Sequence, residues 1–434
     1  MKTYYSKHFT IADNGHLHLD GVDLIDVAKQ YGTPAYVMSE SQLRENCREF
    51  TTAMKRNFGE NYKVAYASKA LCARFLYPIL ASEGIHADVV SGGELYTALK
   101  AGFNPKHLHF HGNNKTEAEL RMAIKYSVGR IIVDNLTELE VLNDLAEELN
   151  AKVNIGFRIK PGIDAHTHDY IRTGQIDSKF GFALENGEAK DAVKKALEYK
   201  NINLCQVHCH IGSQIFDTEP FADAAKVMLG FIAEVKNEFG YTIKELNLGG
   251  GLGAKYTESD APLEIEDYLA PVAEAFHATC KELGIPEPEF HIEPGRSIVG
   301  ESGTTLYTIG NVKNIKDVRT YVSVDGGMTD NPRYALYGAE YTILNASKNA
   351  GELLKNVTVA GKCCESGDLL KEGADIIDPQ RGDILAVLTT GAYNYSMASN
   401  YNRILRPAIV MVKDGRSRVI VQRESYADLL NNDI

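Results

Sequence analysis

Three groups of residues in this chain could carry chemistry together, and each follows a stretch that is typical of a β-strand. Lys69 ends the apolar run 63–68, whereas Gly249 to Gly251 and Glu293 to Arg296 follow two later runs. Taken alone, a lysine is most often a solvated surface residue and a glycine run is most often a turn. An amine, converging backbone N–H groups and an acid together suit pyridoxal phosphate held as a Schiff base.

Glu293 indicates which reaction such a cofactor would serve. In isolation, a carboxylate at a strand end is equally well explained as a structural cap or an ion-pair partner. Against the pyridine nitrogen, an acid keeps the ring protonated and makes it a strong electron sink, as decarboxylation requires. An arginine at that position would favour racemisation. Arg296, nearby in sequence, could bind the cofactor phosphate or a substrate carboxylate.

The histidines suggest an alternative kind of site, one that binds a metal ion. His208 and His210 share one face of a predicted strand, and the spacing repeats in His107, His109 and His111. A His-x-His pair on a barrel strand can bind zinc. That hypothesis leaves the lysine, the glycines and the acid unexplained, so we favour the cofactor and expect no metal. The earlier histidines are expected to be core or loop residues.

Strand and helix patterns alternate between residues 62 and 296. Eight β-rich runs occur at 64–67, 86–90, 107–111, 130–133, 153–159, 204–210, 246–248 and 290–293. Amphipathic stretches lie between them at 93–101, 116–126, 136–149, 221–239 and 265–283. A doubly wound sheet is the alternative, but eight units favour a (β/α)8 barrel of the TIM type, whose active site forms at the carboxyl ends of its strands.

After Arg296 the pattern changes to short strands separated by turns. Strand-like runs occur at 321–324, 356–360, 383–388 and 408–412, with Gly, Asp and Asn between them. The sequence therefore predicts an α/β protein with two domains. A pyridoxal-binding barrel spans residues 31–300, and an all-β barrel or sandwich combines residues 1–30 with 301–434 and completes the active site.

Composition narrows the possible partners and location. The chain of 434 residues carries a net charge of −12 with its acidic residues scattered, which argues against nucleic-acid binding. Seven cysteines without a disulfide-framework spacing fit the reduced thiols of a cytoplasmic protein. The N-terminus has no apolar signal core, and no segment reaches the roughly 18 apolar residues of a membrane span. We expect a cytoplasmic protein without a membrane partner.

Several motifs together resemble the diaminopimelate decarboxylases, which belong to the alanine-racemase-type (fold-type III) class of pyridoxal enzymes. The resemblance runs from Gly32 to Tyr393 and is carried by residues 66–70, 91–94, 178–181, 208–213, 249–251, 293–296, 364–366 and 391–393. It implies that Lys69 is the Schiff-base lysine, that His210 stacks on the cofactor ring and that Glu293 faces the pyridine nitrogen. The implied phosphate ligands are Ser213, Gly249, Gly250 and Gly251, with Gly295 and Arg296 also among the cofactor-binding residues.

The resemblance further implies a small amino-acid substrate with two amino-acid heads. Arg296, Arg333, Tyr337 and Glu365 would bind the head that the cofactor does not consume, and Tyr393 would lie over both cofactor and substrate. Taken alone, Arg333 could equally be an exposed turn residue, and Tyr337 could belong to the core.

A homodimer is implied as well, with Cys364 and Glu365 reaching the site of the other subunit. Cys364 would donate the proton that replaces carbon dioxide, since a thiol is mostly protonated at neutral pH. Cys363 precedes it, and only the following Glu365 and Ser366 set the register. A buried structural thiol is the alternative for either cysteine.

The expected reaction is the decarboxylation of meso-2,6-diaminopimelate to L-lysine, the last step of lysine biosynthesis. One alternative is a decarboxylase of ornithine, lysine or carboxynorspermidine, whose substrates mostly lack the second α-amino-acid head. Another is a catalytically inactive regulatory homologue, which the intact lysine, acid and cysteine argue against.

Overall fold

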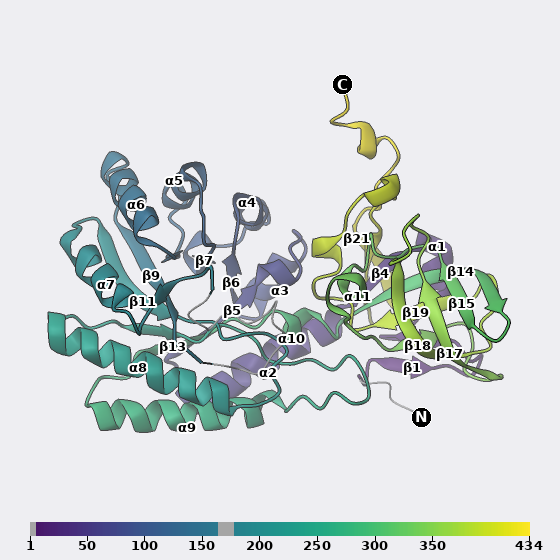
Figure 1. The fold of residues 1–434 in the computed structure, drawn as a ribbon, viewed down its shortest axis with the longest axis horizontal. Coiled ribbons are helices and arrows are strands. Elements are labelled where there is room, and N and C mark those ends of the chain that lie inside the picture. The colour runs from purple at the N-terminus through teal and green to yellow at the C-terminus, as the bar shows by residue number, and fades with distance from the viewer. Residues whose placement is uncertain (1–5, 164–177) are drawn as a thin grey trace. The chain divides into compact units, whose positions relative to one another are not determined.

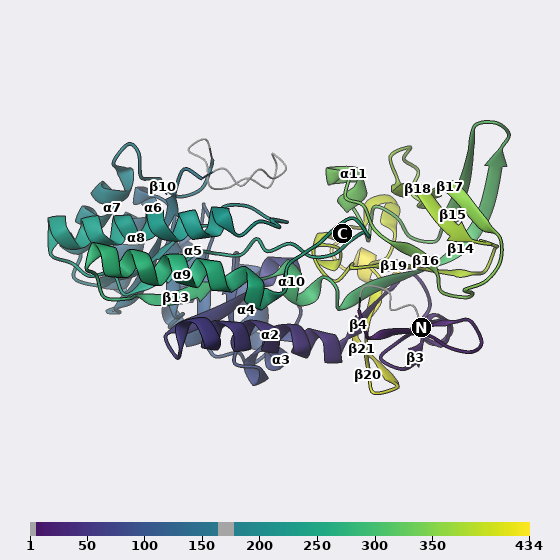
Figure 2. The same ribbon diagram turned by 90° about the horizontal axis from the view of Figure 1, so that it is seen from below.

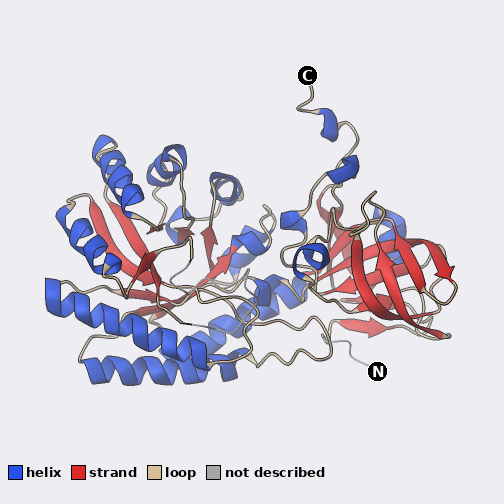
Figure 3. Cartoon of the chain, viewed as in Figure 1, coloured by secondary structure: helices blue, strands red, loops and turns tan. Residues whose placement is uncertain are grey.

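The computed structural model describes residues 6–163 and 178–434, and the chain divides into two compact units. The barrel unit comprises Cys47–Gly253 and Pro262–Gly295, and the β unit comprises Met1–Asn46, Ala254–Ala261 and Arg296–Ile434. Helices surround the strands of the barrel unit, whereas strands dominate the β unit (Figure 3).

Eight parallel strands close the barrel, which confirms the predicted fold. They are β5 (Tyr62–Ala67), β6 (His86–Val89), β7 (Leu108–Phe110), β8 (Arg130–Val133), β9 (Val153–Lys160), β11 (Ile202–His208), β12 (Glu245–Asn247) and β13 (Glu289–Ile292). Each strand pairs with the next, and β13 pairs back with β5 to close the ring. A short strand, β10 (Phe182–Ala183), pairs in parallel with the last two residues of β9.

Helices follow the strands. They are α3 (Leu76–Ser82), α4 (Gly92–Lys100), α5 (Glu117–Lys125), α6 (Leu136–Glu148), α7 (Glu188–Glu198), α8 (Glu219–Phe239) and α9 (Ile265–Leu283). Five of them, α4, α5, α6, α8 and α9, correspond to the predicted amphipathic stretches. Ser91, Thr116 and Asn135 start α4, α5 and α6, because each side chain accepts a hydrogen bond from a first-turn N–H group. Helices α8 and α9 lie side by side in both views (Figures 1 and 2).

Buried polar side chains from several strands lie inside the barrel. Strand alternation sends Leu108 and Phe110 of β7 to one face and His109 to the other. On β11, Gln206 and His208 lie on a single face in the same way, and both are buried. Gln206 reaches His291 of β13, with Nε2 and Nδ1 3.1 Å apart, so polar side chains of different strands meet inside the barrel.

The β unit is built from two sheets. Its smaller sheet contains β1 (Phe9–Ile11), β2 (Leu17–Leu19) and β3 (Val22–Asp23), followed by α1 (Leu24–Tyr31). The larger sheet contains β4 (Ala35–Ser39), β14 (Gly303–Ile315), β15 (Arg319–Val324), β16 (Ile343–Asn345), β17 (Leu353–Ala360), β18 (Leu369–Ile377), β19 (Ile384–Leu388), β20 (Ala408–Lys413) and β21 (Arg416–Val421). Strands β15, β17 and β20 contain three of the runs predicted for this part of the chain, and β19 matches the fourth, 383–388, except for its first residue.

The units divide the chain at other residues than the predicted boundaries of 31 and 300. Strand β4 pairs with β14 and β20, so residues 31–46 belong to the β unit. Residues 254–261 and 296–300 belong there too, and α2 (Glu40–Phe58) runs from the β unit into the barrel unit. The run 35–39 is a buried strand whose partners are more than 250 residues away, and local pattern cannot reveal them.

Within residues 6–163 and 178–434, no helix is both long enough and apolar enough to span a membrane.

Candidate active site

Polar residues gather at the carboxyl ends of the barrel strands, where enzymes of this fold place their active sites. Lys69 lies in the short helix η1 (Ser68–Ala70) directly after β5, and Asp88 lies near the end of β6. His111, His210 and Glu293 follow β7, β11 and β13. The sequence predicted Lys69, His210 and Glu293 at strand ends, and in the structure each of them follows a barrel strand.

Glu293 is buried and held by three donors. His111 Nε2 lies 2.8 Å and Asn247 Nδ2 2.7 Å from Oε1, and His208 Nε2 lies 3.0 Å from Oε2. Burial acts to raise the pKa of Glu293, but its contacts with His111 and His208 outweigh burial and leave that pKa well below the usual range. The carboxylate is therefore ionised at neutral pH.

The imidazoles around Glu293 are neutral. Burial lowers the pKa of His111 to about 3 and also lowers the pKa of His208. Each ring can then donate one N–H to the carboxylate without carrying a charge. His111 was predicted to be a core or loop residue; it is buried, and in addition it contacts the central acid. Its position directly after a barrel strand is the signal that could have identified it, and the same holds for Asn247 at the end of β12.

The histidines do not favour the zinc alternative. His109, His111 and Glu293 offer ligand atoms within 4.8 Å of one another, a spacing that a metal ion could use. However, His111 already binds Oε1 of Glu293, and the His109 ring stacks on that of His291 with centroids 5.6 Å apart. His208 likewise binds Oε2. His111 and His208 therefore act as hydrogen-bond donors to the acid.

The glycine run lies where main-chain carbonyl groups of the neighbouring loops leave no room for side chains. A Cβ atom at Gly249, Gly250 or Gly251 would lie 2.6, 2.1 or 2.5 Å from a carbonyl oxygen of the loops that follow β11 and β13. Gly249 and Gly251 also have φ angles of 70° and 125°, which side-chain-bearing residues rarely adopt. The main chains of three loops thus converge where only glycine fits, and we call this glycine-lined convergence the cradle. Ser213 lies half-buried in one of these loops.

His210 adjoins this cradle. Its Nδ1 would lie 3.1 Å from a Cβ at Gly249. Burial, and then the Lys69 charge, lowers the pKa of His210 well below its usual value, so the ring is neutral. On the next loop, Gly295 packs against Ala67 at the end of β5, where a Cβ would approach to 2.9 Å. Cradle, neutral imidazole and ionised acid together fit pyridoxal phosphate.

Two acids surround Lys69. Asp88 accepts a hydrogen bond of 3.1 Å from the Ser68 N–H, and burial followed by the Glu293 charge raises the pKa of Asp88 well above its usual range. Burial also raises the pKa of Glu94. The Lys69 ammonium opposes both shifts, which places its charge close to both carboxyls. The sequence analysis missed both acids, although Asp88 lies at a strand end.

A separate cluster of arginines and tyrosines lies in the β unit. Arg333 begins α11 (Arg333–Tyr337), and its Cζ lies 5.7 Å from the ring centroids of Tyr256, Tyr337 and Tyr393. Arg296 begins α10 (Arg296–Val299), lies 4.9 Å from the Tyr393 centroid and donates a hydrogen bond to Tyr256. The structure thus brings together four predicted residues, and Tyr256 is an additional member.

Arg333 is only 9% exposed, so it is not the exposed turn residue that the sequence left possible. Among the described residues, no carboxylate forms an ion pair with it, and its Nε has no hydrogen-bond partner. Tyr337 is 36% exposed and therefore not a core residue. A buried cation among tyrosine rings is a suitable site for the carboxylate of a ligand.

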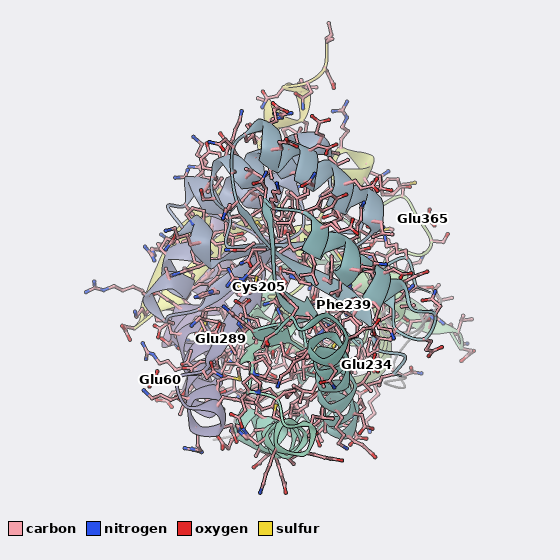
Figure 4. All side chains as sticks on the ribbon, turned by 90° about the vertical axis from the view of Figure 1, so that its left-hand side faces the viewer. Glu60, Cys205, Glu234, Phe239, Glu289 and Glu365 are labelled. Atoms are coloured by element: carbon pink, nitrogen blue, oxygen red, sulfur yellow. The ribbon has the colours of Figure 1, made fainter. Side chains whose placement is uncertain are left out.

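Cys364 and Glu365 lie on a loop between β17 and β18, and both are exposed. The Glu365 side chain stands clear of the ribbon in Figure 4. By contrast, Cys363 is buried, and burial followed by the charge of Asp368 raises the pKa of its thiol to about 12. Only the second of the two adjacent thiols is accessible, which agrees with the register that Glu365 and Ser366 predict.

Fold and site together are those of a pyridoxal enzyme, and comparison with known proteins agrees. Residues 40–300 match the family described as "Pyridoxal-dependent decarboxylase, pyridoxal binding domain". The diaminopimelate decarboxylase of Bacillus subtilis is 48% identical over 97% of this chain and 96% of its own length, and that of Staphylococcus aureus is 46% identical over 97% and 98%. The chain belongs to the diaminopimelate decarboxylase family of pyridoxal-dependent enzymes.

Solved structures give the same result. The diaminopimelate decarboxylase of M. jannaschii, in complex with L-lysine, matches with a TM-score of 0.93 and 38% identity, covering 100% of this chain and 99% of that one. A lysine/ornithine decarboxylase from Vibrio vulnificus, in complex with putrescine, has a TM-score of 0.76 at 22% identity, covering 90% and 98%. The similarity to the Vibrio vulnificus enzyme shows a shared fold and nothing further.

Proposed function

We propose that this protein decarboxylates meso-2,6-diaminopimelate to L-lysine and carbon dioxide with pyridoxal phosphate as cofactor. Membership of the family supports the reaction class, and the buried Arg333 carries the choice of substrate. Diaminopimelate has a second carboxylate that could pair with this guanidinium, whereas ornithine and lysine have none. This buried cation, for which no carboxylate of the described residues forms an ion pair, therefore favours a substrate with two α-amino-acid heads.

The barrel unit supplies the cofactor residues. Lys69 would hold the cofactor covalently, Ser213 and the three glycines would bind its phosphate, and His210 would stack on its ring. Gly295, which packs against the end of β5, would also contact the cofactor, and Arg296 would add a cation for the phosphate or the substrate. When bound, pyridoxal phosphate supplies the electron sink for the carbanion that decarboxylation leaves.

Glu293 would keep a proton on the pyridine nitrogen. Its carboxylate stays ionised because His111, His208 and Asn247 donate hydrogen bonds to it. Both imidazoles are neutral, so they stabilise the carboxylate by hydrogen bonds alone. The negative charge of Glu293 is then left to pair with the protonated pyridine nitrogen. An ionised acid fixed by neutral donors is the group that an electron-withdrawing pyridinium ring requires.

The β unit would bind the rest of the substrate. Arg333 and Arg296 offer charge-assisted bonds to the distal carboxylate, and Tyr337 and Tyr393 offer hydroxyl groups. Glu365 would bind the distal ammonium, and Cys364 would return a proton to the carbanion. Because Cys364 and Glu365 are exposed in the single chain, we propose a homodimer in which they serve the partner's site. The cysteine composition supports a cytoplasmic location.

Carbon dioxide release tests the proposal directly. The purified holoenzyme is assayed with meso-diaminopimelate, L-lysine, L-ornithine and carboxynorspermidine at equal concentrations. We expect release from diaminopimelate alone, with L-lysine as the product. Preferential release from one of the other amines would refute the substrate assignment. A yellow, cofactor-loaded protein without turnover on any of them would instead indicate an inactive homologue.

A further inference from the structure

The loop that presents Cys364 is fixed at its base by a buried carboxylate. Asp368 is 2% exposed and accepts hydrogen bonds from the main-chain N–H groups of Cys363, at 2.7 Å, and Met328, at 2.6 Å. Its own carbonyl accepts the Gly361 N–H at 2.9 Å. Asp368, through its side chain and its carbonyl group, thus joins both ends of the cysteine loop to a neighbouring loop.

The main chain wraps closely around this carboxylate. A Cβ at Gly361 would lie 2.2 Å from Asp368 Oδ2, and a Cβ at Gly327 would lie 2.4 Å from Oδ1. Both positions therefore exclude any side chain while Asp368 keeps its place. The contacts of Asp368 hold the base of the loop in place. They reach only as far as Cys363 and do not orient Cys364.

Cys364 itself is held from another part of the chain. Its main-chain N–H donates a 2.7 Å hydrogen bond to Oδ1 of Asn402, which lies in the short helix η5 (Tyr401–Arg403). Asn402 has φ 53° and ψ 21°, and Arg403 has φ 57°, so two consecutive non-glycine residues adopt the left-handed conformation. Such conformations persist where surrounding structure enforces them, and they concentrate at functional sites.

Neighbouring contacts enforce this turn. The Arg403 N–H binds the Asn400 carbonyl at 2.8 Å, and Asn400 Nδ2 binds the Ile404 carbonyl at 3.0 Å. The Arg403 guanidinium also reaches the C-terminal segment, where it binds the Leu429 carbonyl and Asp433, each at 2.8 Å. The Asn402 amide is thereby aimed at the main chain of Cys364, about 38 residues away in sequence.

We propose that Asn402 is a positioning residue for Cys364. This inference rests on the proposed role of Cys364 as proton donor. Asp368 fixes the base of the loop, and the Asn402 side chain fixes the cysteine itself, so the thiol is presented in one orientation. Asn402 does not touch the reacting atoms and acts only through the Cys364 main chain.

Two substitutions of Asn402 distinguish its role as a hydrogen-bond acceptor for Cys364 from a role in the left-handed turn alone. Glycine tolerates the left-handed conformation better than asparagine but lacks the acceptor, whereas aspartate keeps both an acceptor oxygen and tolerance of that conformation. We expect Asn402→Gly to fold normally and to lose roughly two- to tenfold in kcat, the effect of one hydrogen bond. We expect Asn402→Asp to recover most of that loss.

A second measurement does not depend on turnover. The rate at which iodoacetamide alkylates Cys364 in the holoenzyme is followed by peptide mass spectrometry, and Asn402→Gly should change this rate at least about twofold. Asn150→Gly is a matched control, because Asn150 is another exposed left-handed asparagine, with φ 48°, in the barrel unit.

The proposal is overturned if Asn402→Gly retains the wild-type kcat and alkylation rate, or if Asn402→Asp is as impaired as Asn402→Gly. Failure of the wild-type protein to decarboxylate diaminopimelate would be a different result. It would refute the proposed function, while the alkylation rates would still test whether Asn402 positions the cysteine.

Discussion

Replacing Arg333 by methionine tests how the second head of the substrate is recognised. The guanidinium is buried among the rings of Tyr256, Tyr337 and Tyr393, and no carboxylate of the described residues pairs with it. Methionine retains an unbranched apolar chain against these rings and removes only the charged group. We therefore expect Arg333→Met to fold and to bind the cofactor as the wild type does.

The expected magnitude follows from the contact that is lost. A hydrogen bond to a charged group contributes about 1.5 to 3 kcal/mol, and each 1.4 kcal/mol corresponds to about a factor of ten. The contact with the distal carboxylate would be present before and during the reaction, so its loss should weaken substrate binding without slowing the chemical step. We expect KM for diaminopimelate to rise roughly tenfold to 150-fold, with kcat little changed.

The assay is carbon dioxide release as a function of diaminopimelate concentration, with cofactor content monitored by absorbance. Arg319→Met is the matched control, because Arg319 is an exposed arginine of the β unit that pairs with Glu372 at 2.6 Å. Its replacement should leave KM unchanged. A wild-type KM for Arg333→Met, or an equal rise in both variants, would refute the assignment of Arg333 to the substrate.

Four further substitutions test the remaining residues. Lys69→Ala should abolish the absorbance of the covalently held cofactor, and borohydride reduction of the wild type should label Lys69; label on another lysine would contradict the assignment. Glu293→Gln should lower turnover far more than cofactor affinity, because the phosphate contacts persist while the electron sink weakens, so an unchanged rate would make the acid structural. Cys364→Ala should keep the cofactor absorbance but lose lysine formation, whereas Cys363→Ala should have a mild effect. Mixing inactive Lys69→Ala and Cys364→Ala proteins under subunit exchange should restore activity, because each mixed dimer has one site without a lesion; no recovery despite proven exchange would refute a shared site.

Local sequence determined most of the barrel. Strand-like runs and amphipathic stretches repeat along residues 62–296, and Ser91, Thr116 and Asn135 mark where α4, α5 and α6 begin. These signals act over a few residues, so they can be read without knowledge of the fold. The positions of Lys69, the glycines and Glu293 were predictable for the same reason, since each directly follows a recognisable strand.

Tertiary structure decided which of these residues meet. His111 follows β7, and His208 ends β11, yet both donate to Glu293 because closure of the barrel brings nonadjacent strands to a common interior. The local pattern shows that His111 directly follows a strand, but it does not show that Glu293 is its partner. Arg333 shows the same limit, because a turn sequence does not reveal that three tyrosines will bury its guanidinium. Strand β4 joined the β unit through partners more than 250 residues away. Periodicity reports which face of an element is buried, whereas the identity of its neighbours depends on packing between distant segments.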